Sequence, residues 1–171
     1  MKAGPHSGNS LEQIMRLKFK EQNKLGKFYW GYSGTLCNPL KVQRFAKESV
    51  ERGTWPVLVL SPTSSAYDVG RIQRVSEYSH DNETWTRLEL GAYLWNCRFA
   101  AVASNLRRVQ HFINLNEYVE ATGTKERSLG EYVRHRVSKA CAFFVGESTQ
   151  SRVAKVCYVA ELKFPFCVFL R

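Results

Sequence analysis

The stretch KFYWGYSGTLCNPLKVQRFAKESVERGTWPVLVL, residues 27–60, decides the expected fold. Its first part, residues 27–30, is aromatic and suits a strand, and its last part, residues 56–60, is an apolar run with β-branched residues. Between them, Asn38 can cap a helix that has Pro39 at its first position, and Gly53 can end that helix. The two strands are expected to be parallel if they share a sheet, because a helix crosses between them.

The rest of the chain predicts further helices and an antiparallel section. Apolar periodicity indicates helices over residues 11–24 and 128–145 and a short one over 115–121. Short strands separated by polar turns are expected at residues 70–75, 85–90, 92–97 and 99–103, and apolar C-terminal segments at 153–162 and 164–170. We therefore expect an α+β fold: one domain with a mixed, curled β-sheet, an early strand-helix-strand unit, an antiparallel middle section and two to three packing helices.

The domain is expected to span residues 11–171, because 171 residues suffice for one hydrophobic core and neither a repeat nor a linker interrupts them. Residues 1–10 are rich in Gly, Ser and His and lack an apolar run, so they are expected to be disordered and to be no signal peptide. No apolar stretch approaches the roughly 18 residues that span a bilayer. We expect no membrane partner.

The five cysteines are odd in number, widely spaced and set mostly among apolar neighbours, so they are expected to be reduced core residues of a cytoplasmic protein. None of their spacings matches a zinc site, and the four histidines do not cluster with them. We therefore predict no structural metal and no cofactor.

The formal net charge of +10 indicates an anionic partner, and +6 of it lies within residues 1–52. Nucleic acid or a nucleotide is the expected partner, and an acidic protein surface is a second possibility. A basic surface that serves solubility alone is the simplest alternative. The sequence makes no prediction of the oligomeric state.

The turn at residues 31–35 is the best candidate site. Glycines allow backbone N–H groups to converge on an anion, and the following helix start adds partial positive charge, so we expect ligand contacts from Tyr32, Ser33, Gly34 and Thr35. The turn lacks the spacing of a phosphate-binding P-loop and of a dinucleotide-binding motif. An ordinary strand-to-helix turn remains the alternative.

Two further groups are candidates for ligand binding. If the early strands lie side by side, a hydroxyl-rich loop emerges at the same sheet end as the turn, with Ser61, Thr63 and Ser64. A set of arginines could bind phosphate: Arg98, Arg107, Arg108 and Arg134, with His135 and Lys139 as possible additional members. The alternative is a solvated basic face paired with nearby glutamates.

Catalytic signals are incomplete, so the sequence leaves open whether the protein is an enzyme. Glu161 and Lys163 resemble half of a metal-dependent nuclease site but lack the preceding aspartate, and Cys37 at a helix start has no assigned base. The expected function is an intracellular binding module for a phosphate-bearing ligand. The alternatives are a small nucleotide- or nucleic-acid-processing enzyme, and an interaction or inhibitor protein that docks on an acidic partner.

Overall fold

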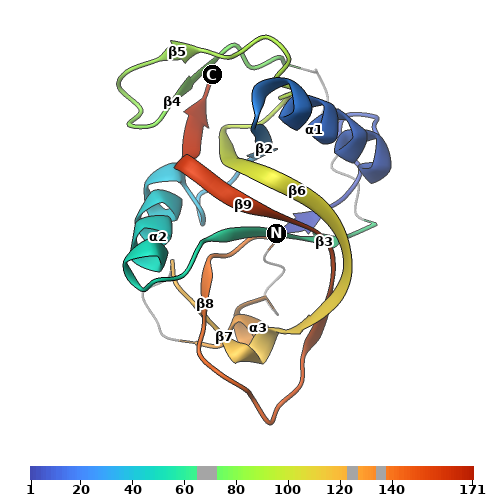
Figure 1. Ribbon diagram of the computed structural model, residues 1–171, viewed down its shortest axis with the longest axis vertical. Coiled ribbons are helices and arrows are strands. Elements are labelled where there is room, and N and C mark those ends of the chain that lie inside the picture. The colour runs from blue at the N-terminus through green and yellow to red at the C-terminus, as the bar shows by residue number, and fades with distance from the viewer. Residues whose placement is uncertain (65–72, 123–126, 134–137) are drawn as a thin grey trace.

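The computed structural model describes residues 1–64, 73–122, 127–133 and 138–171. Within these ranges the chain forms a mixed sheet of seven strands, a second sheet of two strands and three α-helices. Figure 1 shows two long curved strands, β6 and β9, running together through the middle of the molecule. The expected α+β fold with a mixed, open sheet in one domain is confirmed.

The large sheet is built around β9, which has three partners. It pairs antiparallel with β3, β4 and β6, and β6 pairs antiparallel with β2 on its other side. Among the described strands, β1 and β3 are the parallel pair. The strands are β1 (Lys2–Ala3), β2 (Phe28–Tyr32), β3 (Val57–Pro62), β4 (Glu77–Ser79), β5 (Thr86–Arg87), β6 (Phe99–Asn114) and β9 (Val153–Leu170).

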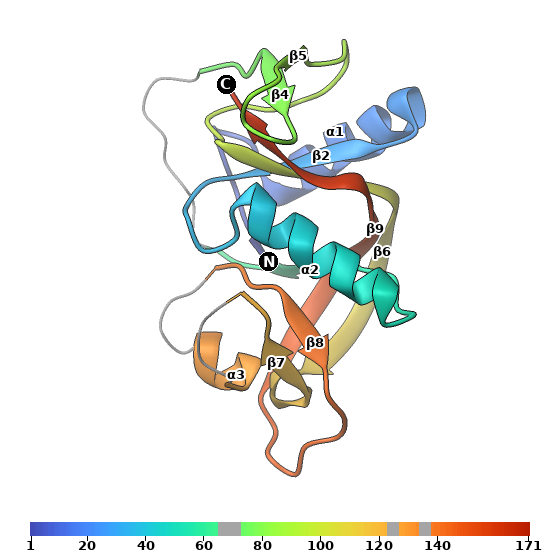
Figure 2. The ribbon, with the colours of Figure 1, turned by 90° about the vertical axis from the view of Figure 1, so that its left-hand side faces the viewer.

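A small second sheet lies at one end of the molecule, beyond helix α2 (Figure 2). It consists of β7 (Tyr118–Glu120) and β8 (Ala142–Phe144), which pair antiparallel. The 3₁₀ turn η1 (Leu115–Glu117) leads from β6 into β7, and helix α3 (Leu129–Tyr132) packs beside η1.

The two longer helices each begin at a capping residue. Helix α1 (Leu11–Leu25) begins with a reciprocal capping box between Ser10 and Gln13. Helix α2 (Pro39–Glu51) has Asn38 as its N-cap, and the Asn38 side chain accepts a hydrogen bond from Lys41 N at 3.0 Å. The Asn38 cap of α2 is confirmed, whereas α1 is expected from apolar periodicity and its capping box is not predicted.

The predicted parallel arrangement of the first two long strands is wrong. Strands β2 and β3 are separated by β6 and β9, and three successive antiparallel pairings make their directions opposite. The physical reason is that β6 and β9, with 16 and 18 residues, are long enough to pair with each other and still accept β2 and β3 at their outer edges. The rule for crossover connections applies only to strands that run in the same direction within a sheet, and β2 and β3 run in opposite directions.

The first ten residues differ from the expected disordered segment. Residues Lys2 and Ala3 form β1 against β3, where Ser61 N donates to Met1 O at 2.9 Å and Thr63 N donates to Ala3 O at 2.8 Å. On the other side, Lys2 N donates to Ser138 O at 2.7 Å. Backbone hydrogen bonds hold this segment, and Ala3 and Met1 pack against the apolar core. Composition does not reveal such backbone bonds.

The helix predicted over residues 128–145 is largely wrong. Helix α3 spans four residues, and residues 142–144 form β8 against β7 instead; residues 134–137 lie outside the described ranges. The aromatic pair Phe143 and Phe144 suits a strand as well as a helix face, and tertiary pairing decides between them. Similarly, the short helix predicted at 115–121 becomes η1 followed by β7.

Other strand predictions hold in part. Residues 99–103 begin β6, and the two C-terminal segments join into the single strand β9. Residues 85–90 contain the short β5, and residues 92–97 contribute one isolated bridge between Arg74 and Trp95. Half of the strand predicted at 70–75, residues 70–72, lies outside the described residues.

The core lies on both faces of the large sheet because neighbouring residues of a strand point to opposite sides. In β2, Phe28, Trp30 and Tyr32 join one apolar cluster with Met15 of α1, whereas Tyr29 joins the other. None of the helices in the described ranges is long and apolar enough to cross a bilayer.

Candidate ligand-binding site

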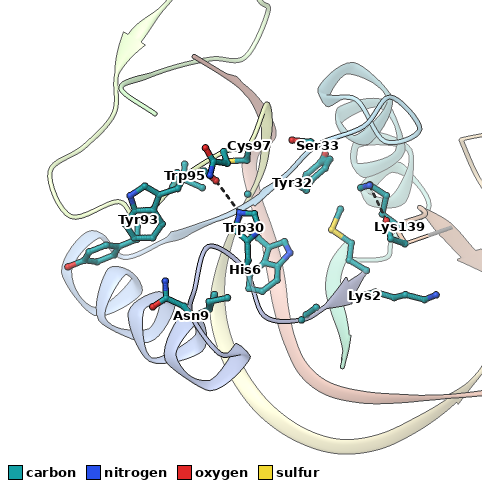
Figure 3. A pocket seen from close by; sticks show the side chains of 18 of the residues that line it. Lys2, His6, Asn9, Trp30, Tyr32, Ser33, Tyr93, Trp95, Cys97 and Lys139 are labelled. Carbon is teal, nitrogen blue, oxygen red and sulfur yellow. Dashed lines mark hydrogen bonds between the residues drawn. The ribbon is translucent and has the colours of Figure 1, made fainter. Parts of the chain in front are cut away.

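A cavity of about 290 Å³ opens beside the turn that the sequence singles out. Its wall comes from β1, α1, β2, the segment before β6, and residues 138–139. Figure 3 shows the aromatic residues Trp30, Tyr93 and Trp95 on one side, and Tyr32, Ser33 and Lys139 on the other. We call it the first cavity.

The turn at residues 31–35 supplies one side of the first cavity through Ser33. Gly34 has a φ of +99°, a left-handed conformation that favours glycine. A Cβ atom placed on Gly34 would lie 3.4 Å from Lys139 Nζ. The backbone of the turn therefore lies directly against an ammonium group.

Lys139 is the central cation of this site. It is half-buried, and its Nζ donates to Ser138 Oγ at 3.2 Å and lies 5.9 Å from the centre of the Tyr32 ring. Burial lowers the pKa of Lys139, and the nearby Cys37 thiolate form opposes this shift. Among the described residues, no carboxylate forms an ion pair with it. Sequence analysis named Lys139 only as a possible member of the arginine set.

The opposite end of the first cavity is aromatic. Trp30 is buried, and the rings of Tyr93 and Trp95 have centroids 6.0 Å apart. His6 Nε2 lies 3.4 Å from Trp95 O and ties the N-terminal segment to this end (Figure 3). The described residues that line the cavity include Lys2, His6 and Lys139 but no Asp or Glu. A ligand with an aromatic ring and an anionic group matches this division.

Tyr32 belongs both to the core and to the wall of the first cavity. Its hydroxyl is buried, donates to Cys37 O at 2.7 Å and lies 3.0 Å from Cys167 Sγ. Burial strongly raises the pKa of Tyr32, and the neighbouring Cys167 adds to the shift. The hydroxyl is therefore part of the core, while the ring is available as part of the cavity wall. Thr35 is exposed and is not among the residues that line the cavity.

The hydroxyl-rich loop does not share a single mouth with the turn. Ser61 pairs with Lys2 across β1 and β3, and Thr63 is half-buried beside Ala3. Ser64 is exposed. Ser61 instead lines a second, larger cavity, which meets the first one at Lys2 and Lys139. Strand β1 thus lies between the two predicted parts of the site.

The predicted arginine set does not form one cluster. Arg98 is exposed just before β6, with its guanidinium 5.7 Å from the centre of the Phe99 ring. Arg107 and Arg108 are exposed nine and ten residues further along, which corresponds to about 30 Å of extended strand. Arg134 and His135 lie outside the described residues.

The two candidate catalytic groups, Glu161 and Cys37, lie in different surroundings. Glu161 accepts a hydrogen bond from Asn105 Nδ2 at 2.8 Å, an interaction within the sheet edge. The Cys141 thiol donates to Cys37 and lowers the pKa of Cys37, burial opposes this shift, and Lys139 adds to it. Within the described ranges, no three His, Cys, Asp or Glu side chains are grouped so that they could hold a metal ion.

Comparisons with protein-family models, with curated proteins and with solved structures find no match.

Proposed function

We propose that the protein binds a phosphate-bearing small ligand, a mononucleotide or a terminal nucleotide of a nucleic acid, in the first cavity. The observation that carries this proposal is the position of the Lys139 ammonium against Gly34, in a cavity whose described lining contains no acidic residue. The phosphate lies between Ser33, Gly34 and Lys139, and the base lies at the aromatic end.

Lys139 has no carboxylate partner among the residues that the structure describes. A half-buried ammonium has lost part of its hydration, which is why burial lowers the pKa of Lys139. A phosphate oxygen about 4 Å away gains about 4 kcal/mol of gross attraction at an effective dielectric constant of about 20. A bound anion also restores the charge balance that no described carboxylate supplies.

The size and the aromatic end of the cavity favour a nucleotide over a bare anion. A volume of about 290 Å³ lies close to the lower limit of roughly 300 Å³ for small-ligand sites. Stacking of a base on an aromatic side chain contributes roughly 1–3 kcal/mol, and Tyr93 and Trp95 provide such rings. A double helix does not fit into this volume, so a polymer would enter through an unpaired nucleotide.

Isothermal titration calorimetry with AMP, GMP, CMP and UMP tests the proposal. At least one of the four is expected to bind with a stoichiometry of one, and with a weak dependence on salt, because few counterions are released. Substitution Lys139→Met is expected to weaken binding about tenfold or more, the effect of losing about 1.4 kcal/mol.

A matched control separates this contact from general loss of positive charge. Lys155 is exposed on β9 and lines neither cavity, so Lys155→Met removes one charge without touching the site. The control is expected to bind as tightly as the unsubstituted protein. No binding of any of the four nucleotides, or equal weakening by both substitutions, overturns the proposal.

A further inference from the structure

A second cavity of about 630 Å³ lies between the large sheet and the small one. Residues of α2, β3 and β9 line one side, and residues of β7, β8 and α3 line the other. Figure 2 shows β8 running up towards α2 with β7 and α3 beside it. The proposed nucleotide site does not use this cavity.

The lining of the second cavity is mainly apolar and reaches the surface. Phe45, Ile113 and Leu129 are three of its contributors, from three different elements. At the rim, the residues Trp55 and Phe144 are 58% and 62% exposed. Contiguous apolar surface of this kind is unfavourable in water and is typical of a binding site.

The charged residues of the second cavity are all cationic. Among the described lining residues are Lys2, Arg52 and Lys139, and no Asp or Glu. The Arg52 guanidinium is already engaged, because it pairs with Glu48 and lies 4.1 Å from the centre of the Phe143 ring. Lys2 and Lys139 line both cavities, so the cations without a described carboxylate partner lie where the two cavities meet.

We propose that the second cavity holds the hydrocarbon chain of an amphiphilic anion, with its charged group at Lys139. Charge complementarity identifies the occupant: an apolar chain matches the lining, and a carboxylate or phosphate matches the unpaired ammonium. Each methylene transferred from water into such a lining increases affinity up to about fourfold. The hydrocarbon chain occupies a different cavity, and its charged group shares Lys139 with the proposed nucleotide site. The inference does not require that a nucleotide binds in the first cavity.

Calorimetric titration with laurate, below the concentration at which it forms micelles, tests the proposal. Laurate is expected to bind with a stoichiometry of one. Octanoate has four methylenes fewer and is expected to bind at least tenfold more weakly. Dodecan-1-ol has the same chain without the charge and is expected to be at least tenfold weaker than laurate, whereas dodecyl phosphate is expected to match or exceed it.

Two neighbouring residues of β9 provide a matched pair of variants. Ala154 lines the second cavity, and Lys155 is exposed and lines neither cavity. Ala154→Trp fills the cavity and is expected to weaken laurate binding at least tenfold, while Lys155→Trp leaves it unchanged. If Ala154→Trp does not fold, Ala142→Leu on β8 fills the opposite wall with a smaller side chain and is expected to act in the same direction.

A third variant separates this proposal from nucleotide binding. Ser33 lines the first cavity but not the second, so Ser33→Trp is expected to abolish nucleotide binding and to leave laurate binding intact. The proposal is overturned if laurate does not bind, if dodecan-1-ol binds as tightly as laurate, or if the cavity-filling variants bind laurate as well as the Lys155→Trp control does.

Discussion

Lys18 and Glu21 form a buried ion pair one helical turn apart on α1. Lys18 Nζ lies 2.8 Å from Glu21 Oε2, and their side chains are 5% and 0% exposed. Glu21 also accepts hydrogen bonds from Tyr29 N and Tyr93 N, at 2.8 Å and 3.2 Å. Burial lowers the pKa of Lys18 and raises the pKa of Glu21, and the pair itself opposes both shifts.

The Glu21→Gln substitution is expected to lower the free energy of unfolding by about 3–5 kcal/mol, because it leaves the Lys18 ammonium buried without a countercharge. Urea unfolding measures the effect. In the double variant Lys18→Met/Glu21→Gln, the free energy of unfolding is expected to fall by less than the sum of the losses in the two single variants. On the same helix, Glu12→Gln breaks a pair whose side chains are 74% and 73% exposed and is expected to cost at most about 1 kcal/mol. Equal losses at the two sites contradict this account.

The stability of the protein is expected to fall in mildly alkaline solution. Burial raises the pKa of Cys97 and of Cys167 from 9.0 to about 12, and at Cys167 the neighbouring Tyr32 hydroxyl opposes the shift. Above pH 9.0 the thiols of the unfolded protein ionise while those of the folded protein keep their protons. This ionisation stabilises the unfolded state relative to the folded state. The expected loss is about 1.4 kcal/mol for each thiol between about pH 8 and about pH 10.

Urea unfolding at several pH values measures this loss, and Cys97→Ala removes one of the two thiols. The variant is expected to show a shallower decline, by about the contribution of one thiol. An identical decline in the variant and the unsubstituted protein assigns the effect to other groups, such as the tyrosines.

Gly31→Ala is expected to destabilise the protein even though alanine suits a strand better than glycine. A Cβ atom on Gly31 would lie 2.7 Å from Cys97 Sγ and 2.8 Å from Leu94 Cδ2. Overpacking of this kind costs about 1–3 kcal/mol, which exceeds the gain of roughly 0.5–1 kcal/mol from replacing glycine. Thermal unfolding measures the difference. In a Leu94→Ala background the loss is expected to be smaller, and a stabilised Gly31→Ala protein contradicts the close contact.

Reversal of charge at Arg107 and Arg108 tests whether an RNA strand reaches beyond the first cavity. Both residues are exposed on β6, and neither lines a cavity. For a single-stranded RNA oligonucleotide, the double Arg→Glu variant is expected to reduce the slope of log K against log salt by about 1.4, the value for two phosphate contacts. Fluorescence anisotropy at several salt concentrations measures the slope. An unchanged slope removes this pair from the nucleic-acid contacts, while AMP binding serves as the control.

Sequence predicted best those features that depend on neighbouring residues. Asn38 and Pro39 predict the start of α2 because N-capping is a contact over three residues. Of the two glycines at 31–35, Gly34 has the positive φ of a turn, whereas Gly31 lies in β2. The apolar periodicity of α1 likewise predicts a helix, but it does not reveal that Lys18 is buried. Lys18 Nζ donates a hydrogen bond to the backbone oxygen of Tyr93, which is 75 residues away in the sequence.

Contacts between distant segments account for the features that sequence missed. Lys139 reaches the turn because Ser138 is hydrogen-bonded to Lys2 of β1, and β1 pairs with β3. No local sequence pattern encodes these contacts between distant segments. The order of the strands depends in the same way on β6 and β9, whose apolar segments are equally compatible with several pairings. Register shifts between Ser104 and Arg107 show how irregular the chosen pairing is.

The three partners of β9 have a consequence for how the protein folds. Residues 57–62, 77–79 and 99–114 acquire their hydrogen bonds to β9 only when residues 153–170 join the sheet. Loop closure over such sequence distances slows folding, and contacts that all depend on one segment form together. A partly folded sheet that lacks β9 therefore leaves β3 and β4 without their main partner. Folding is expected to be slow and strongly cooperative.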